Sequence, residues 1–323
     1  MEYIIVSILL LLTLLGYFKV ASHFNIVDKP NERSAHTEIT LRGGGIIFWF
    51  ASLLYLIQND CSNHLFFLGI TIVSGVSFWD DIQSLPNKFR IAAQFLAMSI
   101  VFYSLHVYTL FPVYGIVLVY VFAVGIINAY NFLDGINGIT GLYSVVVLSS
   151  LLFVNQYLIV FIDRNFIIYP IIACSVFLLF NFRKRAKCFA GDVGSIAIAF
   201  WIIFLILKLI ITTKSYIWLL FLVVYGVDAV CTIMHRFYLK QNIFHAHRLH
   251  FYQILCNDYG FDHRLVAFLY AILQMGVSWV IIFSFKKNDD FFMFLLVSIP
   301  LLLLYSVKFY LINKKQKKSQ FTL

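Results

Sequence analysis

The sequence predicts an all-α polytopic integral membrane protein. Of its 323 residues, 62% are hydrophobic and only 12% are charged, whereas roughly a quarter of the residues of an ordinary soluble domain are charged. The apolar residues form long runs without polar alternation, a pattern that excludes a transmembrane β-barrel. Helices remain, because every backbone polar group inside a bilayer needs a partner within the protein.

About ten or eleven transmembrane helices are expected, because a hydrocarbon core about 30 Å thick requires roughly 17 to 25 apolar residues per helix. Suitable runs lie near residues 3–20, 43–58, 64–79, 89–108, 111–129, 138–160, 165–181, 195–212, 216–236, 263–285 and 291–311. The runs at 43–58 and 111–129 give the weakest signal. The first run lacks a basic start and a small-residue cleavage site, so we expect it to remain as the first helix.

We expect residues 1–323 to form a single multi-pass membrane domain, with residues 312–323 as a basic cytoplasmic tail. No linker, internal repeat or soluble second domain is apparent. The net charge of +9 favours contact with anionic membrane lipid and not with nucleic acid. A homodimer is compatible with the sequence.

The basic residues predict the orientation. If Glu2 faces the outside, one set of loops contains only Arg164, Lys214, Lys286 and Lys287. The other set contains Lys29, Arg33, Arg42, Lys88, Arg90, Arg183, Lys184, Arg185, Lys187, Arg236, Lys240, Arg248, Lys314, Lys315, Lys317 and Lys318. Cytoplasmic loops are enriched in Lys and Arg, so the N-terminus is expected outside and the C-terminus in the cytoplasm.

Four short polar runs fall in the loops expected on the cytoplasmic side. They are Asp80–Pro86, Asn131–Gly138, Phe189–Ser195 and His245–His250. Carboxylates and amides followed by a histidine-rich loop suit Mg²⁺-assisted diphosphate chemistry at a membrane surface. The sequence therefore predicts an enzyme whose active site is formed by cytoplasmic loops. Arg42 and Lys88 lie in the same set of loops and are candidate substrate-binding residues.

Asp80 and Asp81 follow an apolar helix at the expected membrane edge. A carboxylate pair that merely ends a helix is the alternative, but acidic residues at a helix C-terminus oppose the helix macrodipole. Carboxylate oxygens suit Mg²⁺, which usually takes one or two carboxylates together with substrate phosphates.

Asn131, Asp134 and Asn137 are spaced by three residues, and glycines follow them. A helix would bring the three polar side chains onto one face. In a turn, the glycines would instead allow the backbone to approach a ligand closely. Tight helix packing through small residues is a third reading.

Asp192 begins another apolar segment, where it could cap the helix. The N-terminus of a helix also favours anions such as a diphosphate. Asp228 is an ionisable residue in a membrane segment, and such residues are candidates for function.

His245, His247 and His250 surround Arg248 in the longest cytoplasmic loop. Imidazole and guanidinium groups together suit phosphate oxygens. A zinc site and a solvated, pH-sensitive loop are the alternatives, although the spacing fits no standard zinc finger.

The order of these motifs resembles the polyprenyl-phosphate N-acetylhexosamine-1-phosphate transferases, which include phospho-MurNAc-pentapeptide translocase. The motifs are Asp80-Asp81-x3-Leu-Pro, Asn131-Phe-x-Asp134-Gly, Phe-x-Gly191-Asp192-x-Gly-Ser and His-x-His-Arg-x-His-x-Tyr-Gln. The resemblance spans residues from about 28 to 253, and the histidine loop looks most like the branch that initiates O-antigen synthesis.

The resemblance implies transfer of a sugar-1-phosphate from a UDP-N-acetylhexosamine to undecaprenyl phosphate, with Mg²⁺ (or Mn²⁺) as cofactor. The setting would be the bacterial inner membrane, and the products would be a diphospholipid-linked sugar and UMP. Carried over by motif, the catalytic pair is Asp80 and Asp81, the metal ligands are Asp192 and Asp81, and the substrate-binding residues are Asn131, Asp134, Asn137, His245, His247, Arg248 and His250. Asn137 stands where many members have a second aspartate, and the prolines usual before Gly43-Gly44 are absent.

A single displacement fits this chemistry, because a phosphate monoester is already largely dianionic at neutral pH. Asp80 or Asp81 would take the residual proton, and a covalent aspartyl-phosphate is the alternative mechanism. The competing functional class is a membrane transporter of nucleotide sugars or lipid-linked sugars. Transporters concentrate ionisable residues near the bilayer midplane, whereas here they cluster toward one side.

Overall fold

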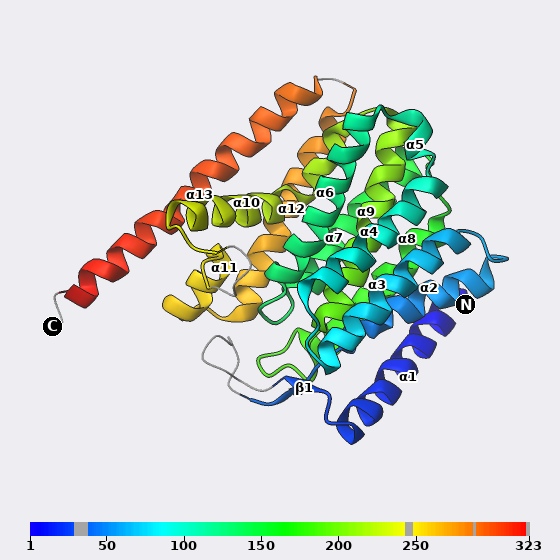
Figure 1. Cartoon of the computed structure of the whole chain (residues 1–323), viewed down its shortest axis with the longest axis horizontal. Coiled ribbons are helices and arrows are strands. Elements are labelled where there is room, and N and C mark those ends of the chain that lie inside the picture. Colours follow the sequence, from blue (N-terminus) through cyan, green and yellow to red (C-terminus); the bar gives the residue numbers. More distant parts are fainter. Residues whose placement is uncertain (29–37, 243–247, 287–288, 321–323) are drawn as a thin grey trace.

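The computed structural model describes residues 1–28, 38–242, 248–286 and 289–320, the last six of these by their backbone alone. The chain is almost entirely helical and confirms the predicted all-α fold (Figure 1). Its helices are α1 (Glu2–His23), η1 (Gly44–Ile46), α2 (Ile47–Gln58), α3 (His64–Ile82), α4 (Asn87–Ser104), α5 (Val107–Leu110), α6 (Val113–Leu133), α7 (Ile139–Tyr157), α8 (Arg164–Asn181), α9 (Gly191–Thr213), η2 (Tyr216–Leu222), α10 (Val223–Tyr238), α11 (Phe251–Gln253), η3 (Ile254–Asp258), α12 (His263–Ser284) and α13 (Asp290–Gln320).

Nine helical segments in the described part of the chain are long and apolar enough to cross a membrane. Two further predicted segments are also helical: the shorter apolar Gly44–Gln58 and the more polar α4. Every one of the eleven predicted runs therefore coincides with helix. The finding supports a multi-pass membrane protein.

Helix α9 is the centre of the bundle. In its most apolar stretch, 78% of the residues are buried inside the protein, and it packs against α3, α6 and α7. The buried apolar side chains form one contiguous core around it. Because α9 begins at Gly191, Asp192 lies in the first turn of this central helix.

The predicted span over 216–236 is helical and is one of the nine segments, but the type of helix changes within it. The segment starts as the 3₁₀-helix η2 and changes at Val223 into α10, which runs across α6 and α12 in Figure 1. The backbone N–H of Val224 donates to Gln274 Oε1 (3.2 Å) and that of Tyr225 to the Tyr143 hydroxyl (3.4 Å). Side chains of other helices thus satisfy backbone groups at the break, as a bilayer requires.

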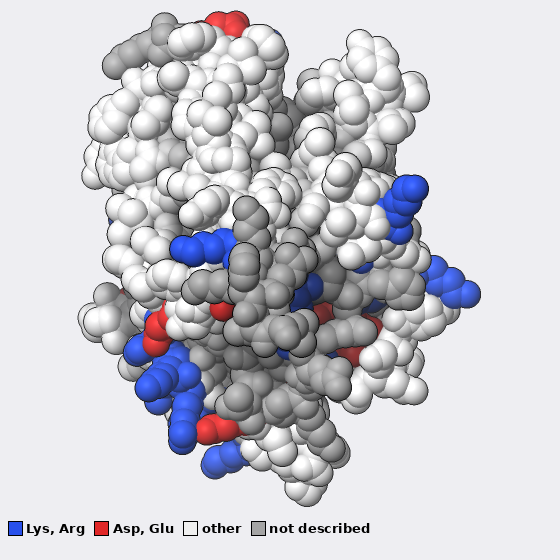
Figure 2. Space-filling model, turned by 90° about the vertical axis from the view of Figure 1, so that its left-hand side faces the viewer, with Lys and Arg blue, Asp and Glu red and all other residues white. Residues whose placement is uncertain are grey.

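The charged side chains are unevenly distributed. On the face shown in Figure 2, Lys, Arg, Asp and Glu gather over the lower half, and the upper half is almost uncharged. The two short strands β1 (Val27–Asp28) and β2 (Thr40–Leu41) form an antiparallel pair at the lower end of the bundle in Figure 1. All the described polar motifs therefore lie near one end of the helices.

Candidate active site

Asp80 and Asp81 lie in the last turn of helix α3, which continues beyond the predicted end at residue 79, and both are buried. Asp80 Oδ1 accepts the backbone N–H of Leu85 at 2.6 Å, which fixes the turn between α3 and α4. The second oxygen of Asp80 lies 3.1 Å from Arg90 Nη1. Two carboxylates at a helix C-terminus are unfavourable by themselves, so neighbouring cations must stabilise them.

Asp81 binds the start of helix α9. Its Oδ1 accepts the backbone N–H of Asp192 at 2.9 Å, and its Oδ2 accepts that of Val193 at 3.0 Å. These amides belong to the first turn of α9, where backbone donors have no partner within the helix. Asp81 Oδ1 also lies 2.7 Å from Arg42 Nε, and the Asp81 side chain is 0% exposed. Asp81 is thus fully engaged in joining α3 to α9.

The contact between Asp81 and α9 requires glycine at position 191. Gly191 has φ +71°, a conformation that residues with side chains rarely adopt, and a Cβ atom there would lie 2.4 Å from Asp81 Oδ2. The glycine that precedes Asp192 in the sequence motif therefore has a geometric explanation.

Asp192 lies in the first turn of α9 and does not cap the helix. Its carboxylate is 3.3 Å from Arg42 Nη2 and 2.7 Å from Arg90 Nη2. Arg90 thus bridges Asp80 and Asp192, while Arg42 bridges Asp81 and Asp192. We call these five residues the carboxylate–guanidinium cluster; it contains three carboxylates and two permanent cations.

Two short segments hold Arg42 in this cluster. The backbone N–H of Phe189 donates to Leu41 at 2.8 Å, and that of Gly44 donates to Phe189 at 2.9 Å. The chain around Arg42 therefore lies beside the chain that leads into Asp192. The Tyr17 hydroxyl donates to the Arg42 carbonyl at 2.6 Å and fixes the same stretch from α1.

Arg90 was missed as a site residue, and Lys88 was predicted instead. Lys88 is exposed, and its ammonium lies 5.2 Å from the centroid of the Phe89 ring. Helix α4 begins at Asn87, so residue 90 turns toward the end of α3 while residue 88 faces away. An arginine can hold two carboxylates at once with its planar fork. A role of Lys88 toward the substrate stays a prediction.

Asn131 connects the end of α6 to the cluster. Its amide donates to Asp192 Oδ2 at 3.3 Å, and its Oδ1 accepts a hydrogen bond from the Ser195 hydroxyl at 2.9 Å. The structure thus brings Asn131, near the end of α6, into contact with Asp192 at the start of α9.

Asp134 and Asn137 lie in a turn beyond the end of α6, so the turn alternative is the correct one. The buried Asn137 amide donates to the Arg183 carbonyl at 2.8 Å, which favours a role in holding the loop. Asn181, which the sequence reading missed, accepts the backbone N–H of Gly138 at 2.7 Å and donates to the Cys188 carbonyl at 2.9 Å. The asparagine at the end of this apolar run is the sequence feature that could have indicated this role.

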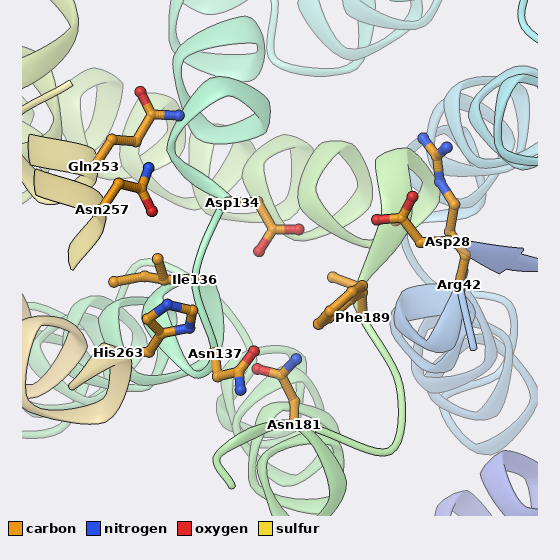
Figure 3. Close-up of a pocket in the computed structure, with 13 residues that line it drawn as sticks. Asp28, Arg42, Asp134, Ile136, Asn137, Asn181, Phe189, Gln253, Asn257 and His263 are labelled. Carbon is orange, nitrogen blue, oxygen red and sulfur yellow. The ribbon is translucent and has the colours of Figure 1, made fainter. Parts of the chain in front are cut away.

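A cavity of about 240 Å³ opens beside the cluster. Arg42 and Gly191 line it on the side of the cluster, and Phe189 contributes an aromatic ring. Figure 3 shows Asp134 between Arg42 and Asp28 on one side and the amides of Gln253 and Asn257 on the other. Burial raises the pKa of Asp134 to about 6, and the nearby charge of Asp192 also raises it. We call this cavity the Asp134 pocket.

The histidine motif is only partly described. His245 and His247 lie outside the described residues, and Arg248 is half-buried. His250 is buried, with Nδ1 3.2 Å from Asp228 Oδ1. This arrangement does not favour direct contact of His250 with a substrate in the Asp134 pocket. From the same region, Gln253 and Asn257 line the pocket.

No three His, Cys, Asp or Glu side chains in the described segments converge as a complete metal site. Asp80 and Asp192 nevertheless come close enough to share one guanidinium group. Mg²⁺ usually needs only one or two carboxylates from the protein, because substrate phosphates and water complete its coordination. Asp81 fits this role less well, because both its oxygens already accept backbone N–H groups.

Fold and site together describe a polytopic membrane protein with a carboxylate-rich centre at one end of its helices. Residues 64–210 match the model of glycosyl transferase family 4. The matched residues make up less than half of the chain. The matched segment includes Asp80, Asp81, Asn131, Asp134 and Asp192, but ends before the histidine motif. No curated protein was matched.

Proposed function

We propose that this protein transfers an N-acetylhexosamine-1-phosphate from a UDP-sugar to undecaprenyl phosphate in the bacterial inner membrane. The products are a diphospholipid-linked sugar and UMP, and the reaction initiates synthesis of an O-antigen-like polysaccharide. The observation that carries this proposal is the carboxylate–guanidinium cluster beside the Asp134 pocket, at one end of a bundle of apolar helices. The family match supports the general class of reaction.

The donor is proposed to lie along the Asp134 pocket. Its diphosphate would lie near Arg42, which lines the pocket and belongs to the cluster. Guanidinium groups suit phosphate oxygens. The uridine would then lie farther from the cluster, where the amides of Gln253 and Asn257 offer hydrogen bonds.

Mg²⁺ is proposed as cofactor, held by Asp192, and substrate phosphates and water would complete its coordination. Asp81, the second metal ligand that the resemblance implied, is fully engaged with Arg42 and the α9 amides, which leaves Asp192 as the proposed ligand. When bound, the ion would neutralise charge on the donor diphosphate. The protein's own part is to place its carboxylates and guanidinium groups around that charge.

The reaction is proposed to be a single displacement. An oxygen of the lipid phosphate forms a bond to the sugar-linked phosphorus of the donor, and the bond from this phosphorus to the bridging oxygen breaks. UMP leaves with that electron pair. Asp80 takes any remaining proton from the acceptor, because its side chain is 8% exposed whereas that of Asp81 is 0% exposed. Arg42 and Arg90 remain as fixed positive charges that orient the phosphates.

A panel experiment tests this function. Membranes that contain the protein would be incubated with undecaprenyl phosphate, Mg²⁺ and one UDP-sugar at a time, and lipid products identified by mass. We expect one diphospholipid-linked N-acetylhexosamine, absent with Asp192→Asn membranes. Uptake of unchanged UDP-sugar into sealed vesicles, with no lipid product from any donor, would instead support the transporter.

A further inference from the structure

Asp228 is a buried carboxylate in helix α10 with several hydrogen-bond donors around it. Only 2% of the residue is exposed. Its Oδ1 lies 3.2 Å from His250 Nδ1 and accepts the backbone N–H of Phe251 at 3.0 Å, and its Oδ2 accepts the Tyr270 hydroxyl at 2.7 Å. The Thr232 hydroxyl donates to Oδ1 at 3.2 Å. One carboxylate therefore joins α10, the start of α11, and α12.

Helix α13 reaches the same group through Lys308, which is 0% exposed. Its ammonium donates to Thr232 Oγ1 at 3.1 Å, and the Tyr305 hydroxyl lies 2.7 Å from that oxygen. Lys308 therefore places a positive charge one side chain away from Asp228. A buried carboxylate persists only when it is paired and hydrogen-bonded, and these contacts meet that requirement.

The contacts of Asp228 lead directly to the Asp134 pocket. His250 and Phe251 begin α11, whose last residue, Gln253, lines the pocket together with Asn257. The Tyr252 hydroxyl donates to the Phe132 carbonyl at 3.0 Å and fixes the same segment to the end of α6. Figure 3 shows the amides of Gln253 and Asn257 on the side of Asp134 away from Arg42.

We propose that Asp228 is a positioning residue for donor binding. By holding His250 and the Phe251 N–H, it fixes α11 and thereby places the Gln253 and Asn257 side chains against the nucleotide part of the donor. The identity of the ligand in this inference rests on the proposed function, whereas the claim that Asp228 fixes α11 does not depend on it.

The test compares Asp228→Ala with Asp228→Asn in the purified full-length protein. The alanine variant loses every acceptor, and we expect about a tenfold rise in KM for the UDP-sugar, with kcat within about twofold of the wild type. Asparagine keeps an oxygen that can accept the Phe251 N–H, so we expect its KM to rise no more than about threefold. A fall in kcat with unchanged KM in the alanine variant would overturn the proposal.

Asn155→Ala serves as the control for general destabilisation. Asn155 is buried in α7, accepts the N–H groups of Phe161 and Ile162, and donates to the Ile162 carbonyl. It does not line the pocket. We expect a lower melting temperature with an unchanged KM.

Thiol labelling provides a readout that does not depend on activity. Cys256 is buried in η3, immediately after α11, and Cys174 is buried in the remote helix α8. We expect Asp228→Ala to speed alkylation of Cys256 at least fivefold and to leave Cys174 unchanged, whereas Asn155→Ala leaves Cys256 at the wild-type rate. Unchanged Cys256 labelling in Asp228→Ala would overturn the positioning role. An inactive wild-type protein would instead contradict the proposed function, and the labelling result would still decide the role of Asp228.

Discussion

Asp81 accepts the backbone N–H of Asp192 at 2.9 Å and so joins the end of α3 to the start of α9. The adjacent aspartates 80 and 81 thereby have different surroundings. Asp81 is closed off by Arg42 and two amides, whereas Asp80 shares Arg90 with Asp192. This difference separates a carboxylate that organises the site from one available for chemistry.

The proposed roles of Asp80 as the base and of Asp192 as the metal ligand predict different pH profiles. The acceptor phosphate is mostly dianionic above about pH 7, so it needs a base mainly at lower pH. We expect Asp80→Asn to lose at least tenfold in kcat at pH 6 and to regain part of that rate by pH 8. Asp192→Asn should lose at least a hundredfold at both values, because a lost metal ligand is not replaced by raising the pH. Steady-state rates across this range provide the measurement, and equal profiles for the two variants would contradict the assignment.

Gly191→Ala should damage the site without replacing a charged residue. The new methyl group would meet Asp81 Oδ2, and the positive φ adds strain of about 1–2 kcal/mol. We expect at least a tenfold fall in kcat and a lower melting temperature. Gly16→Ala in α1, where nothing lies within 4 Å of the added Cβ atom, is the matched control and should stay within twofold. Equal behaviour of the two variants would mean that the contact with Asp81 is unimportant.

Asp134 predicts a pH dependence of stability. Burial raises its pKa from 3.8 to about 6, so the folded protein holds this proton more tightly than the unfolded chain does. The resulting stabilisation is complete below about pH 4 and is lost as the pH rises through about 6. Asp134→Asn lacks this loss, so its melting temperature relative to wild type should rise by a few degrees between pH 4.5 and 7.5.

Asp262→Asn is the control for this measurement. Hydrogen bonding from Arg264 lowers the pKa of Asp262. The melting temperature of Asp262→Asn relative to wild type should therefore change with pH in the direction opposite to that of Asp134→Asn. A relative melting temperature of Asp134→Asn that falls with pH would show that the charged form of Asp134 is the stabilised one.

The orientation can be tested with a native cysteine. Cys61 is exposed in the loop between α2 and α3, which the positive-inside rule places outside. A membrane-impermeant maleimide should therefore label Cys61 in intact cells. In a Cys61→Ser background, a cysteine at the exposed Ser84 should be labelled only after the membrane is opened. Labelling of position 84 in intact cells would place the cluster on the wrong side for a cytoplasmic donor.

The sequence predicted the helices well, because apolar runs of bilayer length have few alternatives to helix. It also predicted that Asp80, Asp81, Asn131 and Asp192 lie at one end of the bundle, and they are in contact there. Assigning the loops to one side of the membrane shows which residues can meet, but it does not show in which direction each side chain points. The rotation of α4 decides that Arg90, and not Lys88, faces Asp80.

Long-range contacts account for the remaining differences. Gln274 in α12 supports the break before α10, and no proline or glycine at residues 220–223 marks that break. Asp228 and Lys308 are distant in the sequence, and their connection through Thr232 depends on the packing of α10 against α13. Such partners are set by tertiary packing and leave no local pattern.

The release of UMP tests the central claim most directly. Purified protein would be given a UDP-N-acetylhexosamine with and without undecaprenyl phosphate, each in the presence of Mg²⁺ or of a chelator, and UMP and lipid product would be quantified by mass. Direct transfer predicts UMP only when lipid and Mg²⁺ are both present, in an amount equal to the diphospholipid formed. UMP released without lipid, together with a phosphosugar adduct on Asp80 or Asp81, would contradict the single displacement. No UMP under any condition with any donor would contradict the transferase itself.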